Sequence, residues 1–133
     1  MSERSVIVFV DDDQDVLSGM KNMMFRDRAR WDMVFLCGGP PAIDYLNMHP
    51  FDVVVSDMRM PEMDGEAVMA VARLVSPHAG RIVLSGYADA EARERLVPLV
   101  DQWLGKPCGV VELRAAIEKA LARRAAAIAP EPT

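Results

Sequence analysis

Five short apolar runs, rich in β-branched residues, alternate along the chain with stretches in which apolar residues recur every three or four positions. Each run predicts a β-strand; they lie at residues 5–10, 33–37, 53–57, 81–84 and 102–105. Each intervening stretch predicts an amphipathic helix; these lie at residues 14–28, 41–48, 65–74, 90–97 and 110–127. Alternation on this period predicts an α/β fold, a doubly wound five-stranded parallel sheet with helices on both faces.

Capping and breaking residues support these boundaries. Asp13 is suited to cap the helix that begins at residue 14, and Pro98 ends the helix at residues 90–97. The last residues carry two prolines and little that could pack in a core. We therefore predict one domain at residues 5–127, with a disordered tail or the start of a linker at residues 128–133.

The charge balance limits the classes of partner. The 133 residues include 15 basic and 20 acidic side chains, a net charge of −5. This balance argues against a broad nucleic-acid or membrane-surface face. The sequence contains no transmembrane run, and its first residues lack the apolar core of a signal peptide. We therefore expect a cytoplasmic protein with no nucleic-acid or membrane contact by this domain.

Polar residues stand where four of the predicted strands end. Asp11 and Asp12 follow the first strand, Asp57 ends the third, Ser85 follows the fourth and Lys106 follows the fifth. Each has an ordinary explanation alone, because strand ends often carry capping aspartates, hydrogen-bonding serines and surface lysines. In a parallel sheet, however, these ends meet at one edge, where open α/β folds bind ligands. The joint pattern predicts a site there.

The residue types in this pattern point to phosphoryl chemistry. Three clustered carboxylates repel one another and raise one another's pKa, so the cluster is explained best by a divalent cation such as Mg²⁺, which takes oxygen ligands and keeps positions for a phosphate. Asp57 can then act as a nucleophile toward phosphorus. Lys106 and the Ser85 hydroxyl would contact the phosphoryl oxygens.

The chain resembles a receiver domain of the response-regulator family, from two-component signalling. The matching segments lie at residues 8–13, 56–65, 84–86 and 106–107, within a resemblance that spans residues 5–127. The resemblance implies a flavodoxin-like fold with strand order 2-1-3-4-5 and five helices. It also implies that Asp57 is the phosphoacceptor.

Further roles follow from the resemblance, position by position. Asp12 and Asp57 would bind Mg²⁺ directly, Asp11 would act through water, and the backbone carbonyl of Arg59 would complete the protein ligands. Lys106 would contact the phosphoryl group, and the Lys106–Pro107 bond would be cis.

The resemblance also implies two sets of regulatory residues. Ser85 would move toward the phosphate, and Trp103 stands at the position of the family's switch aromatic, for which plain core packing is the alternative. Arg59 and Tyr87 occupy positions that modulate the lifetime of the phosphate in this family. Both are large, and we predict that they shield the acyl phosphate from water.

The leading hypothesis is a phosphorylation-dependent switch rather than an enzyme acting on other molecules. A sensor histidine kinase or a histidine phosphotransfer domain would supply the phosphoryl group. The responding surface would be residues 90–97, 102–105 and 110–127, which could also form a homodimer. The alternative is a small Mg²⁺-dependent phosphatase of the haloacid-dehalogenase type that uses Asp11. A scaffold that is never phosphorylated is a third hypothesis.

Overall fold

The predicted architecture is confirmed by a computed structural model, which describes residues 4–61, 64–86 and 89–129. Five parallel strands form one sheet in the order β2-β1-β3-β4-β5. The strands are β1 (Ser5–Asp11), β2 (Trp31–Cys37), β3 (Val53–Asp57), β4 (Gly80–Ser85) and β5 (Gln102–Gly105). Order 2-1-3-4-5 is the flavodoxin-like arrangement.

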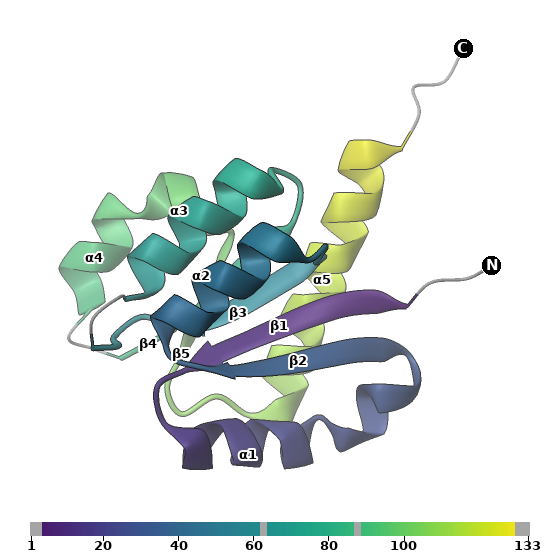
Figure 1. The fold of residues 1–133 in the computed structure, drawn as a ribbon, viewed down its shortest axis with the longest axis horizontal. Helices are drawn as coiled ribbons and strands as arrows, with labels where there is room; N and C mark the ends of the chain where they lie inside the picture. The colour runs from purple at the N-terminus through teal and green to yellow at the C-terminus, as the bar shows by residue number, and fades with distance from the viewer. Residues whose placement is uncertain (1–3, 62–63, 87–88, 130–133) are drawn as a thin grey trace.

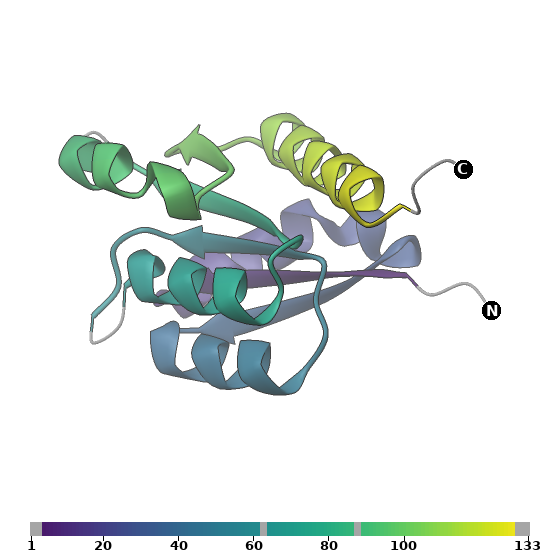
Figure 2. The same ribbon diagram turned by 90° about the horizontal axis from the view of Figure 1, so that it is seen from above.

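Helices connect successive strands and cover both faces of the sheet (Figures 1 and 2). They are α1 (Gln14–Met23), α2 (Gly39–Met48), α3 (Gly65–Val75), α4 (Ala90–Arg95) and α5 (Val110–Ile128). Two 3₁₀ helices, η1 (Phe25–Ala29) and η3 (Val97–Leu99), follow α1 and α4. Among the described residues, no helix has both the length and the apolar character needed to cross a membrane.

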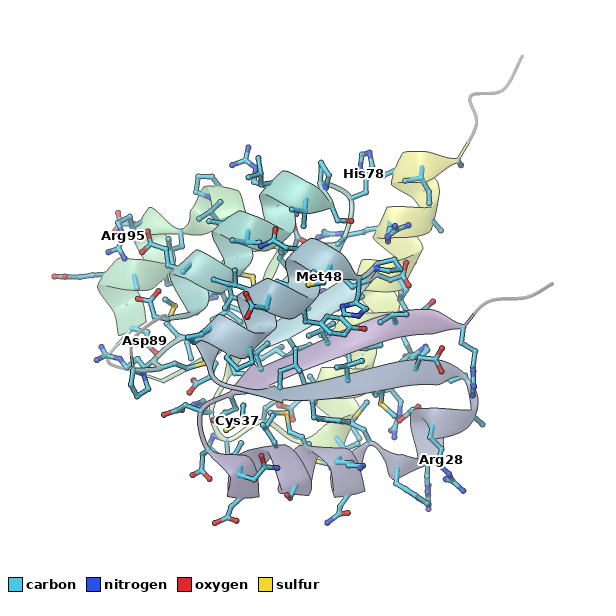
Figure 3. The ribbon with its side chains drawn as sticks, viewed as in Figure 1. Arg28, Cys37, Met48, His78, Asp89 and Arg95 are labelled. Atoms are coloured by element: carbon cyan, nitrogen blue, oxygen red, sulfur yellow. The ribbon has the colours of Figure 1, made fainter. Side chains whose placement is uncertain are left out.

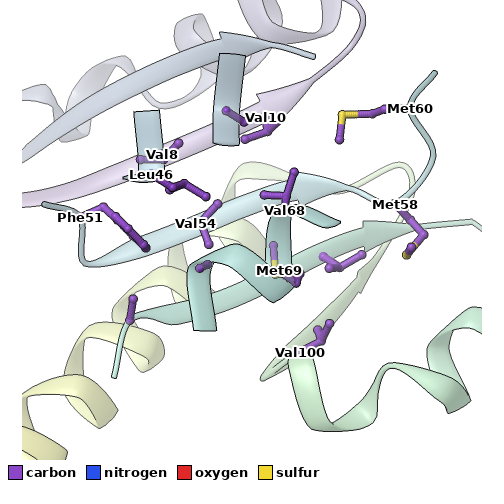
Figure 4. Close-up of a cluster of buried hydrophobic side chains, with 14 of the residues drawn as sticks. Val8, Val10, Leu46, Phe51, Val54, Met58, Met60, Val68, Met69 and Val100 are labelled. Atoms are coloured by element: carbon purple, nitrogen blue, oxygen red, sulfur yellow. The ribbon is translucent and has the colours of Figure 1, made fainter. Parts of the chain in front are cut away.

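The two faces of the sheet carry separate cores, since successive side chains of a strand point in opposite directions. Val8 and Val54 lie on the face covered by α2 and α3, where Leu46 and Met69 pack against them (Figure 4). Phe9 and its neighbours on the other face pack against α1 and α5. Because both faces are covered, the strands are apolar at nearly every position, which explains the continuous runs in the sequence.

Several predicted element boundaries differ from those of the structure. The second strand begins at Trp31, which is buried and pairs with Ser5, rather than at residue 33. The first α-helix ends at Met23, and the residues predicted to extend it form η1 instead. The fourth helix has only six residues, because Pro98 has no N–H to donate to the preceding turn. The C-terminal helix includes residue 128, which the prediction gave to the tail; residues 130–133 lie outside the described residues.

The turn in η1 buries a charged side chain against α5. Asp27 is 4% exposed and accepts hydrogen bonds from Arg114, at 2.9 Å from Nη2, and from Arg30, at 2.9 Å from Nη2. Arg30 also pairs with Glu118 at 2.9 Å. This network links η1 to the first half of α5.

Close packing of α5 on the sheet depends on a residue without a side chain. A Cβ atom placed on Gly80, at the start of β4, would lie 2.5 Å from the Cβ atom of Ala120. Cβ atoms do not approach this closely, so the helix lies against the strand only because position 80 is glycine.

Candidate functional site

The carboxyl ends of β1, β3, β4 and β5 bring the predicted site residues to one edge of the sheet. Asp11 and Asp57 are the last residues of β1 and β3, and Ser85 is the last residue of β4. Lys106 follows β5, and its amide donates a hydrogen bond to the Ser85 carbonyl at 3.0 Å. Parallel pairing therefore brings together residues as far apart in the sequence as Asp11 and Lys106.

Three carboxylates form the centre of this edge. Asp11, Asp12 and Asp57 each offer an oxygen atom within 4.8 Å of the others. Asp11 and Asp57 are buried, whereas Asp12 is exposed. Burial raises the pKa of Asp11 above its ordinary value, the amide of Asp13 opposes this by donating a hydrogen bond, and repulsion from Asp57 raises it further. Such a cluster opposes its own ionisation unless a cation joins it.

One carboxylate oxygen atom of Asp11 accepts no hydrogen bond from the described residues. Asp11 Oδ1 accepts the Asp13 amide at 2.9 Å, but Oδ2 is buried and accepts no hydrogen bond from any residue that the structure describes. Leaving a buried carboxylate oxygen without a partner is costly. Three carboxylates around such an atom fit a hard divalent cation, whose ligands are oxygen atoms. The acidic triad is therefore able to hold a metal ion of the Mg²⁺ type.

Lys106 supplies positive charge to this cluster. Its Nζ lies 2.5 Å from Asp57 Oδ1. The lysine side chain is 42% exposed while that of Asp57 is 8% exposed, so the ammonium group covers the carboxylate from the solvent side. The Lys106–Pro107 bond is cis, as predicted. The ammonium group and the metal-binding oxygens thus meet at Asp57.

Ser85 and Trp103 lie toward the α4 side of the site. Ser85 is 8% exposed and borders a depression of about 380 Å³, together with Gly86, Asp89 and Lys106. Trp103, in β5, is half-buried, and the guanidinium carbon of Arg93 lies 5.6 Å from the centre of its ring. Its ring also packs against the core cluster on the α2 and α3 face of the sheet.

Only one of the two residues predicted to control phosphate lifetime lies within the described residues. Arg59 has a side chain that is 68% exposed, and its Nε donates a hydrogen bond to Asp89. Tyr87 lies outside the described residues. Asp89, which is 5% exposed, also lies at this edge and was not among the predicted site residues. No sequence signal identified it, because an aspartate before a helix is typical of an ordinary cap.

Glycine shapes the loop that follows Asp57. A Cβ atom on Gly65 would lie 2.6 Å from the Asp57 carbonyl oxygen, and the Gly65 amide donates a hydrogen bond to the Met58 carbonyl at 2.9 Å. Asp64 caps α3 through the amides of Glu66 and Ala67. Gly65 therefore lies tightly against the end of β3, where a larger residue would displace the Asp57 backbone.

Comparison with known proteins agrees with this geometry. Residues 7–118 match the family described as "Response regulator receiver domain". The chain is 28% identical over 118 residues to the "Uncharacterized transcriptional regulatory protein YesN" of Bacillus subtilis, covering 87% of this chain and 32% of that protein. It is 29% identical over 126 residues to the "Tetrathionate response regulatory protein TtrR" of Salmonella typhimurium, covering 94% of this chain and 60% of that protein. The chain thus spans less than two thirds of these relatives.

Solved structures share the same fold. A structure described as "adenylate cyclase from Rhodopirellula baltica" superposes with a TM-score of 0.85 at 30% identity, covering 94% of this chain and 93% of that one. The family match covers most of the chain and includes the acidic triad and Lys106. The sheet has the flavodoxin-like strand order. The chain therefore belongs to the response-regulator receiver domains of two-component signalling.

Proposed function

We propose that this receiver domain is a phosphorylation switch in which Asp57 accepts a phosphoryl group from a histidine kinase or a histidine phosphotransfer domain. The observation that carries the proposal is that Asp57 contacts both an acidic cluster and a positively charged side chain. Its carboxylate belongs to the acidic triad and also pairs with Lys106 at 2.5 Å. Receiver domains partner with histidine kinases, and the donor would be a phosphohistidine of such a protein.

The proposed transfer is a displacement at phosphorus. An Asp57 carboxylate oxygen forms a bond to phosphorus while the bond from phosphorus to the imidazole nitrogen breaks, and the imidazole keeps the electron pair. Phosphoryl transfer depends mainly on positioning and charge neutralisation. When bound, Mg²⁺ supplies charge neutralisation to the carboxylates and to the phosphoryl oxygens. Asp11, Asp12 and Asp57, with the backbone carbonyl of Arg59, are the proposed ligands.

Lys106 and Ser85 have complementary proposed roles. Lys106 already lies within contact distance of Asp57, and its ammonium group would bind a phosphoryl oxygen. The Ser85 hydroxyl would bind another oxygen and draw the segment after β4 toward the site. Trp103 would respond to this movement and change the surface formed by α4, β5 and α5, through which a partner or a second copy would read the phosphorylated state. The domain is a phosphoacceptor in this scheme and acts on no other substrate.

Arg59 and Tyr87 are proposed to set the lifetime of the acyl phosphate. Both side chains are large enough to hinder the approach of water, so we expect slow self-hydrolysis. This part of the proposal is independent of the phosphorylation site itself. A lifetime of only seconds at neutral pH would contradict it while leaving Asp57 as the acceptor.

The test is phosphorylation of the chain by acetyl phosphate with Mg²⁺, followed by intact-mass analysis. We expect one added phosphoryl group on the wild-type chain and none on Asp57→Asn. In the haloacid-dehalogenase alternative the nucleophile is Asp11. Asp11→Asn would then lose labelling, and Asp57→Asn would keep it. Labelling of Asp57→Asn at the wild-type level would exclude the proposed function.

A further inference from the structure

A buried carboxylate at the start of α4 joins two segments that border the phosphorylation site. Asp89 Oδ2 accepts the amide of Gly86 at 2.9 Å, and Oδ1 accepts Arg59 Nε. Figure 3 shows Asp89 at the end of α4 nearest the loops at the sheet edge. Gly86 directly follows Ser85, and Arg59 lies two residues after Asp57. Asp89 therefore connects a side chain two residues after the proposed phosphoacceptor to the backbone amide that follows the proposed phosphate-binding serine.

The ion pair is asymmetric in burial. The Asp89 side chain is 7% exposed, whereas that of Arg59 is 68% exposed. Water can hydrate Arg59 without Asp89, but a carboxylate this deeply buried needs its cation, because an uncompensated buried charge is strongly unfavourable. Asp89 consequently depends on Arg59 more than Arg59 depends on Asp89.

The pair also lies between two depressions of the surface. One, of about 450 Å³, is bordered by Arg59 and Asp89. The other, of about 380 Å³, is bordered by Asp89, Ser85 and Lys106. Asp57 precedes Arg59 by two residues and contacts Lys106, which borders the second depression.

We propose that Asp89 is a positioning residue that holds the Ser85–Gly86 segment in its unphosphorylated position only while Arg59 neutralises it. This inference rests on the proposed phosphorylation of Asp57. A phosphoryl group brings a charge of roughly −1.5 to −2, and a guanidinium binds phosphate oxygens in bidentate geometry. The modified Asp57 competes with Asp89 for Arg59, Asp89 then turns to water, and the Gly86 amide loses its acceptor.

The geometry predicts that a second substitution, at Asp89, restores the Gly86 hydrogen bond that Arg59→Ala loses. Arg59→Ala removes the cation, so Asp89 leaves its buried position and releases Gly86 without any phosphorylation. Asp89→Asn keeps an oxygen acceptor for the Gly86 amide but carries no charge, so it needs no cation. The double variant Arg59→Ala/Asp89→Asn should therefore hold Gly86 as the wild type does.

The experiment measures hydrogen exchange of the Gly86 amide by NMR in the unphosphorylated chain. We expect exchange about tenfold faster in Arg59→Ala than in the wild type, the factor for one hydrogen bond of ordinary net strength, and wild-type exchange in the double variant. Arg95→Ala is the matched control, because Arg95 borders the same depression but pairs with Glu66 at 2.7 Å. Unchanged exchange in Arg59→Ala, or no rescue in the double variant, would overturn the inference.

Acetyl phosphate with Mg²⁺ provides the second arm. In the wild type we expect the Gly86 amide to exchange about tenfold faster after phosphorylation, again by loss of one hydrogen bond, and in Asp89→Asn we expect no change. If the wild type takes up the phosphoryl group but keeps Gly86 protected, the inference is wrong while the proposed function holds. If the wild type takes up no phosphoryl group, the proposed function fails. Gly86 exchange in Arg59→Ala and in the double variant then still shows whether Asp89 holds Gly86 only while Arg59 neutralises it.

Discussion

The buried Asp27 and the acidic triad at the sheet edge differ in how many cations surround them. Asp27 has two guanidinium groups, those of Arg30 and Arg114, as direct partners. At the sheet edge, three carboxylates share one ammonium group, that of Lys106, among the ion pairs of the described residues. In the first network two guanidinium groups face two carboxylates, because Arg30 also pairs with Glu118, whereas the second has more negative charge than its protein partners neutralise.

The pKa values move in opposite directions for this reason. Burial raises the pKa of Asp27, but hydrogen bonds from Arg114 and Arg30 outweigh it, so the pKa lies below its ordinary value. The pKa of Asp11 lies above its ordinary value, because burial dominates and Asp57 repels it. A carboxylate that is fully paired by the protein stabilises the fold. A carboxylate left short of partners is ready to bind a metal ion.

The largest expected effect separates the two groups by function. Lys106→Ala removes the ammonium group beside Asp57, and we expect phosphorylation by acetyl phosphate with Mg²⁺ to slow about 100-fold, as when one transition-state donor is lost. Arg114→Ala is the control, since it removes a cation from the other group and should leave the rate unchanged. The initial rate is measured by intact mass in quenched samples. Equal rates for Lys106→Ala and wild type would show that the ammonium group at the sheet edge has no role in phosphorylation.

The next effect concerns stability. Asp27→Asn should lower the free energy of unfolding by about 2 kcal/mol, because hydrogen bonds to a charged group are lost at a buried site. Denaturant unfolding measures the change. Asp32→Asn is the matched control, since Asp32 is exposed in β2 and Arg4 is its ion-pair partner among the described residues. We expect the control to change stability by less than about 0.5 kcal/mol.

Acid should remove the stabilisation by Asp27. Because its folded-state pKa is lowered, the stabilisation is fully present above the unfolded pKa, near about 4, and is lost as the pH falls through the folded value. The difference in unfolding free energy between wild type and Asp27→Asn should therefore be constant at neutral pH and shrink in acid. A difference that grows in acid would contradict the assigned direction of the pKa.

The smallest effect has the opposite sign. Without metal, Asp11→Asn should raise the free energy of unfolding by up to about 1 kcal/mol, because it relieves like-charge repulsion. The penalty from Asp11 exists above its raised pKa and disappears as the pH falls toward its unfolded value, so the gain should vanish in acid. Thermal unfolding in a chelating buffer measures it. Saturating Mg²⁺ should stabilise the wild type more than the variant, and equal stabilisation would mean that Asp11 plays no part in metal binding.

The sequence predicted the sheet and the acidic edge because both depend on local patterns. The apolar runs ended in Asp11, Asp57 and Ser85, and parallel strands bring such ends together whatever the details of the connections. Lys106 joined them by the same reasoning. The polar side chains at this edge could therefore be identified before any coordinates were known.

The paired charges could not be predicted in this way. Asp27 meets Arg114 across 87 positions of sequence, and Arg59 meets Asp89 across 30. The sequence around Asp27 alternates acidic and basic residues, a pattern typical of an exposed helix end. Its burial depends on the turn into η1, which ends α1 at Met23. Only the tertiary fold decides which aspartate turns inward.

The contact between Gly80 and Ala120 restricts how this domain can diverge. Only 2.5 Å would separate two methyl carbons there, so the interface has room for a single one. A library randomised at both sites should therefore yield folded members with alanine at position 80 only when glycine stands at position 120. The two sites, 40 residues apart in the chain, would then covary through volume alone, with no chemistry passing between them.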